Sequence, residues 1–299
     1  MTDNRPPPRP PLKRRIAQAT RGARMAVARG VLGALGLKMS PYEQARAPVD
    51  LTPKPARVPP PSAAPARPDR FFPERSAALR VDACTVCGDP LAALVKDEYC
   101  PACNTPGRTR ALAPLLAEVV GPLVEGSPVR ELPLLGFAMA GAERKLLAPV
   151  FPSLKSVSLF GEYGRDHELG VDARDLTRYA GDSFSGHFSI LLFDYFTEQE
   201  QAIREAFRVI APGGVFMTEL GPYRLRDGWD APYQVKEVRR REGYFEYLPE
   251  GVALADIRVG RQWFLQAMED AGFQVRWVQV HDRATGKDLD WFVGVKPAA

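Results

Sequence analysis

The chain has 299 residues, of which 45% are hydrophobic, enough for one large domain with an appendage or for two small domains. Its four cysteines form two close pairs, which argues against a disulfide-stapled secreted scaffold. The sequence has no apolar run of membrane-spanning length, and its N-terminus is Pro- and Arg-rich, unlike a signal peptide. We therefore expect a cytoplasmic protein.

The net charge of +4 is divided unevenly along the chain. Residues 1–80 hold 16 Lys and Arg against 5 Asp and Glu, a net charge of +11, together with 15 of the 29 prolines. The remaining residues carry −7. This composition predicts a disordered, basic, Pro-rich tail over residues 1–80 in front of an acidic globular body.

Within the tail, residues 16–37 interleave apolar side chains with arginines. This pattern is typical of a basic amphipathic helix that docks on a membrane surface, a nucleic acid or a protein partner. Four glycines weaken such a helix, so a solvated linker is the alternative. A protein assembly or a membrane surface is the favoured partner, which would place the protein at the membrane periphery. Nucleic acid is less favoured, because the acidic body would repel phosphate.

Two C-x-x-C pairs, Cys84 with Cys87 and Cys100 with Cys103, are separated by twelve residues. Each pair can direct two thiolates at one ion, and the intervening segment can fold as a hairpin that closes a tetrahedral site. We expect a structural zinc ribbon over residues 81–110, with redox dithiols or an iron–sulfur site as the alternatives. Four thiolates leave no open coordination position, so this zinc would hold structure without doing chemistry.

The body is expected over residues 111–299 and begins with a helix at 111–124. A strand then leads into a loop of small residues at 136–141, followed by a helix near 142–147. Further apolar runs predict strands at 155–160 and 188–193.

Residues 197–220 predict a helix and a strand joined by a tight turn. Thr197 and Glu200 form a capping box, and apolar residues follow at helical spacing. The Ala211–Gly214 segment, A-P-G-G, ends the helix, and residues 215–217 begin a buried strand. With the strand at 188–193, this makes one βαβ unit of a parallel sheet.

The pattern A-x-R-E-x-x-R-V-I-x-P-G-G at 202–214 resembles the class I S-adenosylmethionine-dependent methyltransferases, in which it forms a helix and the fifth strand. A helix at 261–271 and strands at 275–280 and 291–295 resemble the end of that domain, so the resemblance covers roughly residues 84–296. It implies an α/β, Rossmann-like sheet, mostly parallel with an antiparallel last strand. The stretch 104–110 resembles the end of the N-terminal ribbon in a bacterial subgroup of the family. Its Arg108 and Arg110 either brace the ribbon against the body or begin a solvated helix.

The resemblance implies an S-adenosylmethionine site built from residues that follow successive strands: Gly136, Ala138, Gly141, Glu162, Asp172, Ala173 and Asp194. Small residues at 136–141 would let the backbone approach the cofactor. Glu162 would bind the ribose hydroxyls, and Asp172 with Ala173 would meet the adenine edge. The acid that usually precedes the loop is replaced here by an apolar stretch.

These features predict methyl transfer to an unidentified small-molecule acceptor, with a saccharide or another small metabolite favoured. The alternative is an inactive methyltransferase-like scaffold or accessory subunit that docks on an assembly through the basic tail. The three histidines lie in no recognisable base motif, so the sequence assigns no catalytic base. An aromatic, charged insertion at 221–252 is expected to form a substrate wall or lid.

Overall fold

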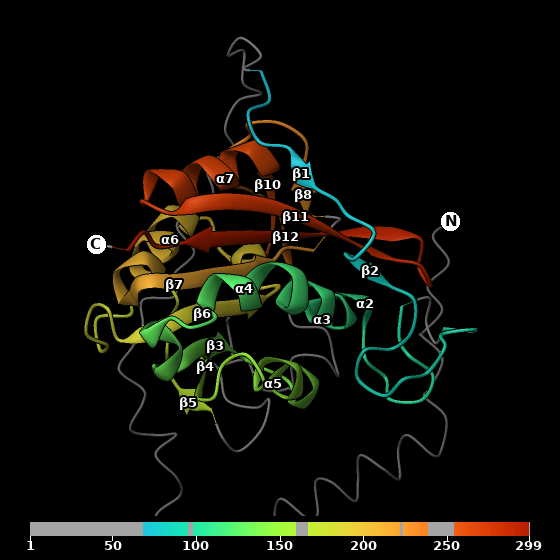
Figure 1. Ribbon diagram of the computed structural model, residues 1–299. Coiled ribbons are helices and arrows are strands. Elements are labelled where there is room, and N and C mark those ends of the chain that lie inside the picture. The colour runs from blue at the N-terminus through green and yellow to red at the C-terminus, as the bar shows by residue number, and fades with distance from the viewer. Residues whose placement is uncertain (1–67, 95–97, 160–166, 222–223, 239–253, 299) are drawn as a thin grey trace, which may run out of the picture. The chain divides into compact units, whose positions relative to one another are not determined.

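The computed structural model describes residues 68–94, 98–159, 167–221, 224–238 and 254–298 (Figure 1). Contacts within the chain divide it into two units, Met1–Thr52 and Pro53–Ala299, and all described residues belong to the second. The predicted amphipathic segment 16–37 and most of the predicted tail therefore lie outside the described residues. Within the described part, no helix is long and apolar enough to cross a membrane.

One large sheet organises the described residues, in the order β1-β11-β12-β7-β6-β3-β4-β5, with β2 also on β11 (Figure 1). Its strands are β1 (Pro73–Glu74), β2 (Arg80–Val81), β3 (Leu134–Phe137), β4 (Leu154–Ser158), β5 (Glu168–Leu169), β6 (Phe184–Ile190), β7 (Ile210–Glu219), β11 (Gln274–Asp282) and β12 (Lys287–Val295). The strands from β5 to β7 are parallel, and β12 runs antiparallel between β7 and β11. The predicted antiparallel last strand is thereby confirmed.

The predicted βαβ unit is present as β6, α6 (Gln199–Val209) and β7. The A-P-G-G segment, predicted as a turn before the strand, lies within β7, where the pairing with β6 is irregular between Ile210 and Val215. Gly213 adopts a positive φ of 81° there. The predicted capping box is wrong: α6 begins after Glu198, and its first turn has no side-chain cap. The reason is that the buried Gln199 side chain donates to the Phe193 carbonyl and fixes the start of the helix there.

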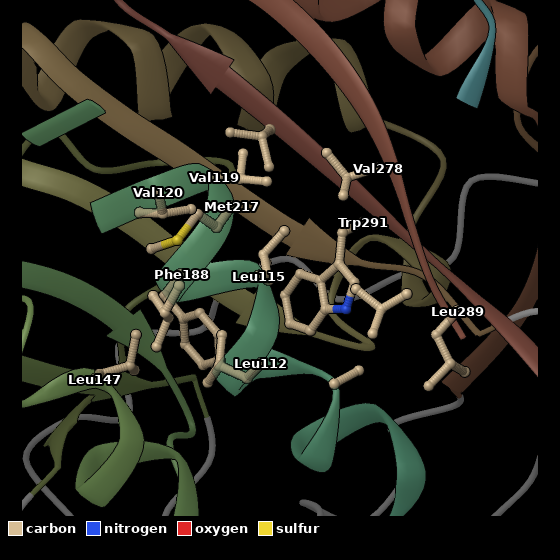
Figure 2. Packing of buried hydrophobic residues seen from close by; sticks show 14 of the residues in the cluster. Leu112, Leu115, Val119, Val120, Leu147, Phe188, Met217, Val278, Leu289 and Trp291 are labelled. Carbon is tan, nitrogen blue, oxygen red and sulfur yellow. The ribbon is translucent and has the colours of Figure 1, made fainter. Parts of the chain in front are cut away.

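One face of the sheet is covered by a nearly continuous helical segment and by α5 (Gly141–Leu147). The segment consists of α2 (Gly107–Arg110), α3 (Leu112–Leu115), a π-helical turn η2 (Leu116–Val120) and α4 (Gly121–Val124). Its apolar side chains pack on Phe188, Met217 and Trp291 of the sheet (Figure 2). The same cluster includes Cys84 and Cys100, so the cysteine-bearing segment shares the core of the body.

The opposite face is covered by α6 and α7 (Arg261–Asp270), whose buried residues pack on Phe216 and Phe292. Short 3₁₀ turns, η3 (Pro128–Glu131) and η4 (Phe193–Tyr195), precede β3 and follow β6. The terminal hairpin of β11 and β12 turns at residues 283–286.

The insertion after β7 contributes a second sheet of three strands, β8 (Leu225–Arg226), β10 (Leu254–Gly260) and β9 (Tyr233–Val238). Residues 239–253 of the insertion lie outside the described residues.

Residues 68–81, rich in proline and assigned mostly to the tail from composition, pack on the body. Strands β1 and β2 pair with β11, and the amides of Arg70 and Phe71 donate to the Gln262 side chain. The Phe71 ring packs against the core, whereas 72% of the Phe72 surface is exposed.

Candidate functional site

The carboxyl ends of β3, β4, β5, β6 and β7 lie along one edge of the sheet, because these strands are parallel neighbours. Hydrogen bonds hold the segments that follow them close to this edge: Ala138 N donates to Val157 O at 2.8 Å, and Leu191 N to Glu219 O at 3.0 Å. Every described residue of the predicted cofactor site follows or ends one of these strands. Ligands of open α/β sheets bind at this edge.

Gly136 lies within β3, whereas Ala138 and Gly141 follow the strand, so the three residues have different environments. A Cβ at Gly136 would lie 2.3 Å from the sulfur of Met139, so a larger residue there would require the Met139 side chain to move. Ala138 has a positive φ of 49°, which turns the chain out of the strand. Gly141 begins α5, and a Cβ there would meet no atom within 4 Å. The open space of this loop is therefore at Gly141.

Glu143, which the sequence did not single out, ties this loop to α2. Its buried carboxylate accepts from Ala140 N at 2.8 Å and from Thr109 Oγ1 at 3.1 Å. Burial raises the pKa of Glu143 above its usual range, against the effect of these hydrogen bonds and the Arg108 charge.

The residues expected to meet the nucleoside lie on two segments. Glu162 falls outside the described residues. Asp172 follows β5, and its carboxylate pairs with Arg174 at 2.7 Å, while Ala173 beside it is buried. The Asp172 carboxylate is thus held in one orientation by its neighbour's guanidinium.

Asp194 is buried in η4 at the end of β6. Arg224 donates to its backbone carbonyl at 2.9 Å, and the Arg224 Nε lies 3.5 Å from its carboxylate. Arg224 also lies over the Tyr195 ring. The insertion therefore reaches the carboxyl end of β6 through this arginine.

A cavity of about 40 Å³ lies between the ends of β6 and β7 and the cysteine-bearing segment. Its walls are Glu98, Gly107, Arg108, Leu191, Glu219, Gly221, Thr285, Lys287 and Leu289. Glu219 is 1% exposed, and burial raises its pKa to about 8. Sequence reasoning missed Glu219, although a lone acid that ends the apolar run of β7 was the available signal.

The four cysteines come together as predicted. Their sulfur atoms all lie within 4.8 Å of one another, with Cys84 and Cys103 3.5 Å apart and Cys87 and Cys100 3.6 Å apart. A tetrahedral ion with metal–sulfur bonds of about 2.3 Å would separate its sulfurs by about 3.8 Å. The geometry and the all-sulfur donor set therefore fit a tetrahedral metal site.

Matching turns hold the two cysteine pairs. Gly88 N donates to Cys84 O at 2.8 Å, and Asn104 N donates to Cys100 O at 2.9 Å. Gly88 and Asn104 both have positive φ, 81° and 57°. Asn104 can replace the usual glycine because asparagine tolerates the left-handed region better than most residues.

The predicted brace of the ribbon is confirmed for Arg110. This fully buried side chain donates to the carbonyls of Glu98 and Thr105 in the cysteine segment and to Asp282 at the end of β11. Arg108 is half-buried and faces the cavity.

The three histidines lie in different surroundings. His187 is buried in β6 and stacks on Phe216 with ring centroids 4.8 Å apart, and burial lowers its pKa to about 3. His167 bonds to Ser156, and His281 pairs with Asp288 on the surface.

Comparison with known proteins gives one family match: residues 152–218 match a family described as a methyltransferase domain. No curated protein matches the chain significantly. Among solved structures, DesVI of Streptomyces venezuelae is 21% identical over 64% of this chain and 94% of its own, with a TM-score of 0.40. The Burkholderia thailandensis 1,6-didemethyltoxoflavin-N1-methyltransferase is 12% identical over 64% and 79%, with a TM-score of 0.43.

The matched residues include β4, β5, β6, α6 and most of β7. Around them, β3 lies between β4 and β6, and the antiparallel β12 lies between β7 and β11. The match therefore shows a methyltransferase-like domain over residues 152–218, within a sheet that continues on both sides of the matched strands.

Proposed function

We propose that the protein transfers a methyl group from S-adenosylmethionine to a small polar acceptor, with a saccharide or another small metabolite favoured. The observation that carries this proposal is the family match over residues 152–218 on a sheet with the antiparallel β12 between β7 and β11. The open space at Gly141, at the carboxyl edge of that sheet, fits a bound cofactor.

The residues proposed to hold the cofactor are those of the carboxyl edge: Gly136, Ala138, Gly141, Glu162, Asp172, Ala173 and Asp194. Bound S-adenosylmethionine supplies an electrophilic methyl group on a sulfonium. The chain's own part is to fix the acceptor in line with that methyl group and to exclude water, which can supply much of the acceleration. Asp194 and Arg224 tie the insertion to this edge, so the insertion is proposed as a wall of the acceptor site.

We assign the four-cysteine cluster to structural zinc. Four thiolates in a closed tetrahedral arrangement suit zinc and leave no position for a substrate. The cluster lies in the hydrophobic core shared with α3 and β12, which supports a role in holding the wall of the cavity beside Glu219.

Calorimetric titration of the zinc-loaded protein with S-adenosylhomocysteine tests the proposed function. We expect saturable binding that is abolished in Gly141→Arg, because the new side chain would fill the open space at the loop. The matched control is Ala148→Arg, which adds the same side chain at the exposed far end of α5. A folded protein without binding at millimolar ligand would point instead to the scaffold alternative.

A further inference from the structure

The cavity beside Glu219 is built from three parts of the chain. Leu191 and Glu219 come from the ends of the sheet, Gly107 and Arg108 from α2, and Lys287 and Leu289 from β12. Its volume is about 40 Å³, and a single water needs about 10–15 Å³ measured this way. The cavity therefore admits a fragment of a few heavy atoms, such as one or two hydroxyl groups of a larger molecule.

One carboxylate oxygen of Glu219 is left without a partner by the described residues. Its side chain is 1% exposed, and its Oε2 has no hydrogen-bond partner among the described residues. Trp291, opposite Glu219 in the pairing of β12 with β7, has an indole nitrogen that is equally buried and unpaired within that part of the chain (Figure 2). Burying such groups without hydrogen-bond partners destabilises the folded state. A buried carboxyl kept at this cost on a cavity wall indicates a ligand.

The other charged groups around Glu219 are already paired. Glu98 pairs with Lys287 at 2.9 Å, Asp194 with Arg224, and Asp290 with Arg261 at 2.9 Å. Arg108 is the exception: among the described residues it forms no hydrogen bond or ion pair. Of the charged groups at the cavity, Glu219 can therefore accept a hydrogen bond from a ligand, and Arg108 can donate one.

We propose that Glu219 binds the acceptor hydroxyl and takes its proton during methyl transfer, while Arg108 donates to a neighbouring oxygen of the same molecule. This inference rests on the proposed function and narrows it to O-methylation of a compound with adjacent oxygens. The hydroxyl oxygen forms the bond to the methyl carbon, the sulfonium keeps the electron pair of the broken carbon–sulfur bond, and the hydroxyl proton passes to the Glu219 carboxylate. Solvent then removes that proton.

The electrostatics suit this role. Burial raises the pKa of Glu219, as do the nearby acids Asp194, Asp290 and Glu98, whereas Arg108 opposes the rise. The resulting pKa of about 8 is close to neutral pH, where a general base is most effective.

The first test needs no acceptor. Since the folded pKa lies above the unfolded value, the folded state holds an extra proton between about pH 4.5 and 8. Relative to Glu219→Gln, the wild-type folding equilibrium constant should fall by about tenfold per pH unit within this range and level off above it. Urea unfolding of the wild type and of Glu219→Gln from pH 5 to 9 measures the two folding equilibrium constants. If their ratio did not change with pH, Glu219 would be an ionised, paired carboxylate, and the assignment would be overturned.

The second test uses methyl hexopyranosides as probe acceptors and follows formation of S-adenosylhomocysteine. We expect a rate that rises with pH to a plateau above about pH 8, and at least a 100-fold loss in Glu219→Gln with unchanged affinity for S-adenosylhomocysteine. Arg108→Gln should raise the acceptor KM about tenfold. The control is Glu200→Gln, at an exposed position of α6, which should change neither the rate nor the acceptor KM.

The outcomes separate the two proposals. An unchanged rate in Glu219→Gln, or no hexopyranoside turnover by a protein that binds S-adenosylhomocysteine, would overturn the role of Glu219 and leave the proposed function standing. A protein that binds no S-adenosylhomocysteine would overturn the proposed function, and this inference with it.

Discussion

Arg110 and Asp282 form a fully buried ion pair, with Nη2 2.6 Å from Oδ2 and no exposed surface on either side chain. The arginine ends α2, and the aspartate ends β11. Asp282 also accepts from Ala284 N, and Arg110 donates to two carbonyls of the cysteine segment. The pair thus fastens the ribbon, the helical segment and the terminal hairpin at one point.

Replacing Arg110 with methionine should lower the free energy of unfolding by about 3–5 kcal/mol, because it leaves the Asp282 carboxylate buried without its partner. The double variant Arg110→Met with Asp282→Leu should lose less than the two single variants together. Urea unfolding of all four proteins gives the coupling energy. Additive losses would contradict a direct interaction.

Loss of the cluster metal should destabilise the body as well as the ribbon, because Cys84 and Cys100 lie in the shared core. We expect one zinc per chain by elemental analysis, none in Cys100→Ser, and a melting temperature lowered by at least about 5 °C. Asn104→Gly is the matched control, since its positive φ suits glycine and the metal should be retained. Zinc binding by Cys100→Ser would argue against the four-thiolate site.

His187 should make the protein acid-sensitive. Its pKa of about 3 in the folded state lies below the unfolded value near 6.5, so below pH 6.5 the unfolded state binds the extra proton. Relative to His187→Phe, wild-type stability should fall by about 1.4 kcal/mol per pH unit from pH 6.5 toward pH 4. Parallel unfolding curves of the two proteins at each pH check this slope. Equal pH dependence would mean that His187 is protonated in the fold.

Gly136→Ala should destabilise the protein by about 1–3 kcal/mol, because the new methyl group would overlap the Met139 side chain. Adding Met139→Ala should recover part of that loss, since it removes the overlapping atoms. Thermal unfolding of the single and double variants measures the recovery. Failure of Met139→Ala to rescue would show that another contact requires glycine at this position.

The sequence predicted those features that depend on local spacing. Two C-x-x-C pairs sufficed for the cysteine cluster, and the segment 197–220 sufficed for α6 and for a strand after it, although β7 begins five residues earlier than predicted. The start of α6 was missed because the buried contact of Gln199 with Phe193 outweighed the capping pattern at Thr197. Strands β1 and β2 were missed because each has only two residues in a Pro-rich stretch and depends on β11 for its pairing.

The candidate site was harder to predict because it depends on contacts between residues that lie far apart in the sequence. Arg110 was named as one of two arginines that could brace the ribbon, but its partner lies 172 residues further along the chain. Glu219 became notable only when the fold placed Arg108 and β12 around it. The proposed cofactor site remains a prediction that the binding experiments address. It comprises Gly136, Ala138, Gly141, Glu162, Asp172, Ala173 and Asp194.

The separation of Arg110 from Asp282 also fixes an order of events during synthesis. The cysteine segment can capture its metal soon after it leaves the ribosome, because all four ligands lie within twenty residues. Its docking partner on β11, Asp282, is made 172 residues after Arg110. Until then, the apolar face of α3 and the Arg110 guanidinium lack the partners that cover them in the folded protein. Nascent chains of this protein should therefore depend on chaperones until the terminal hairpin emerges.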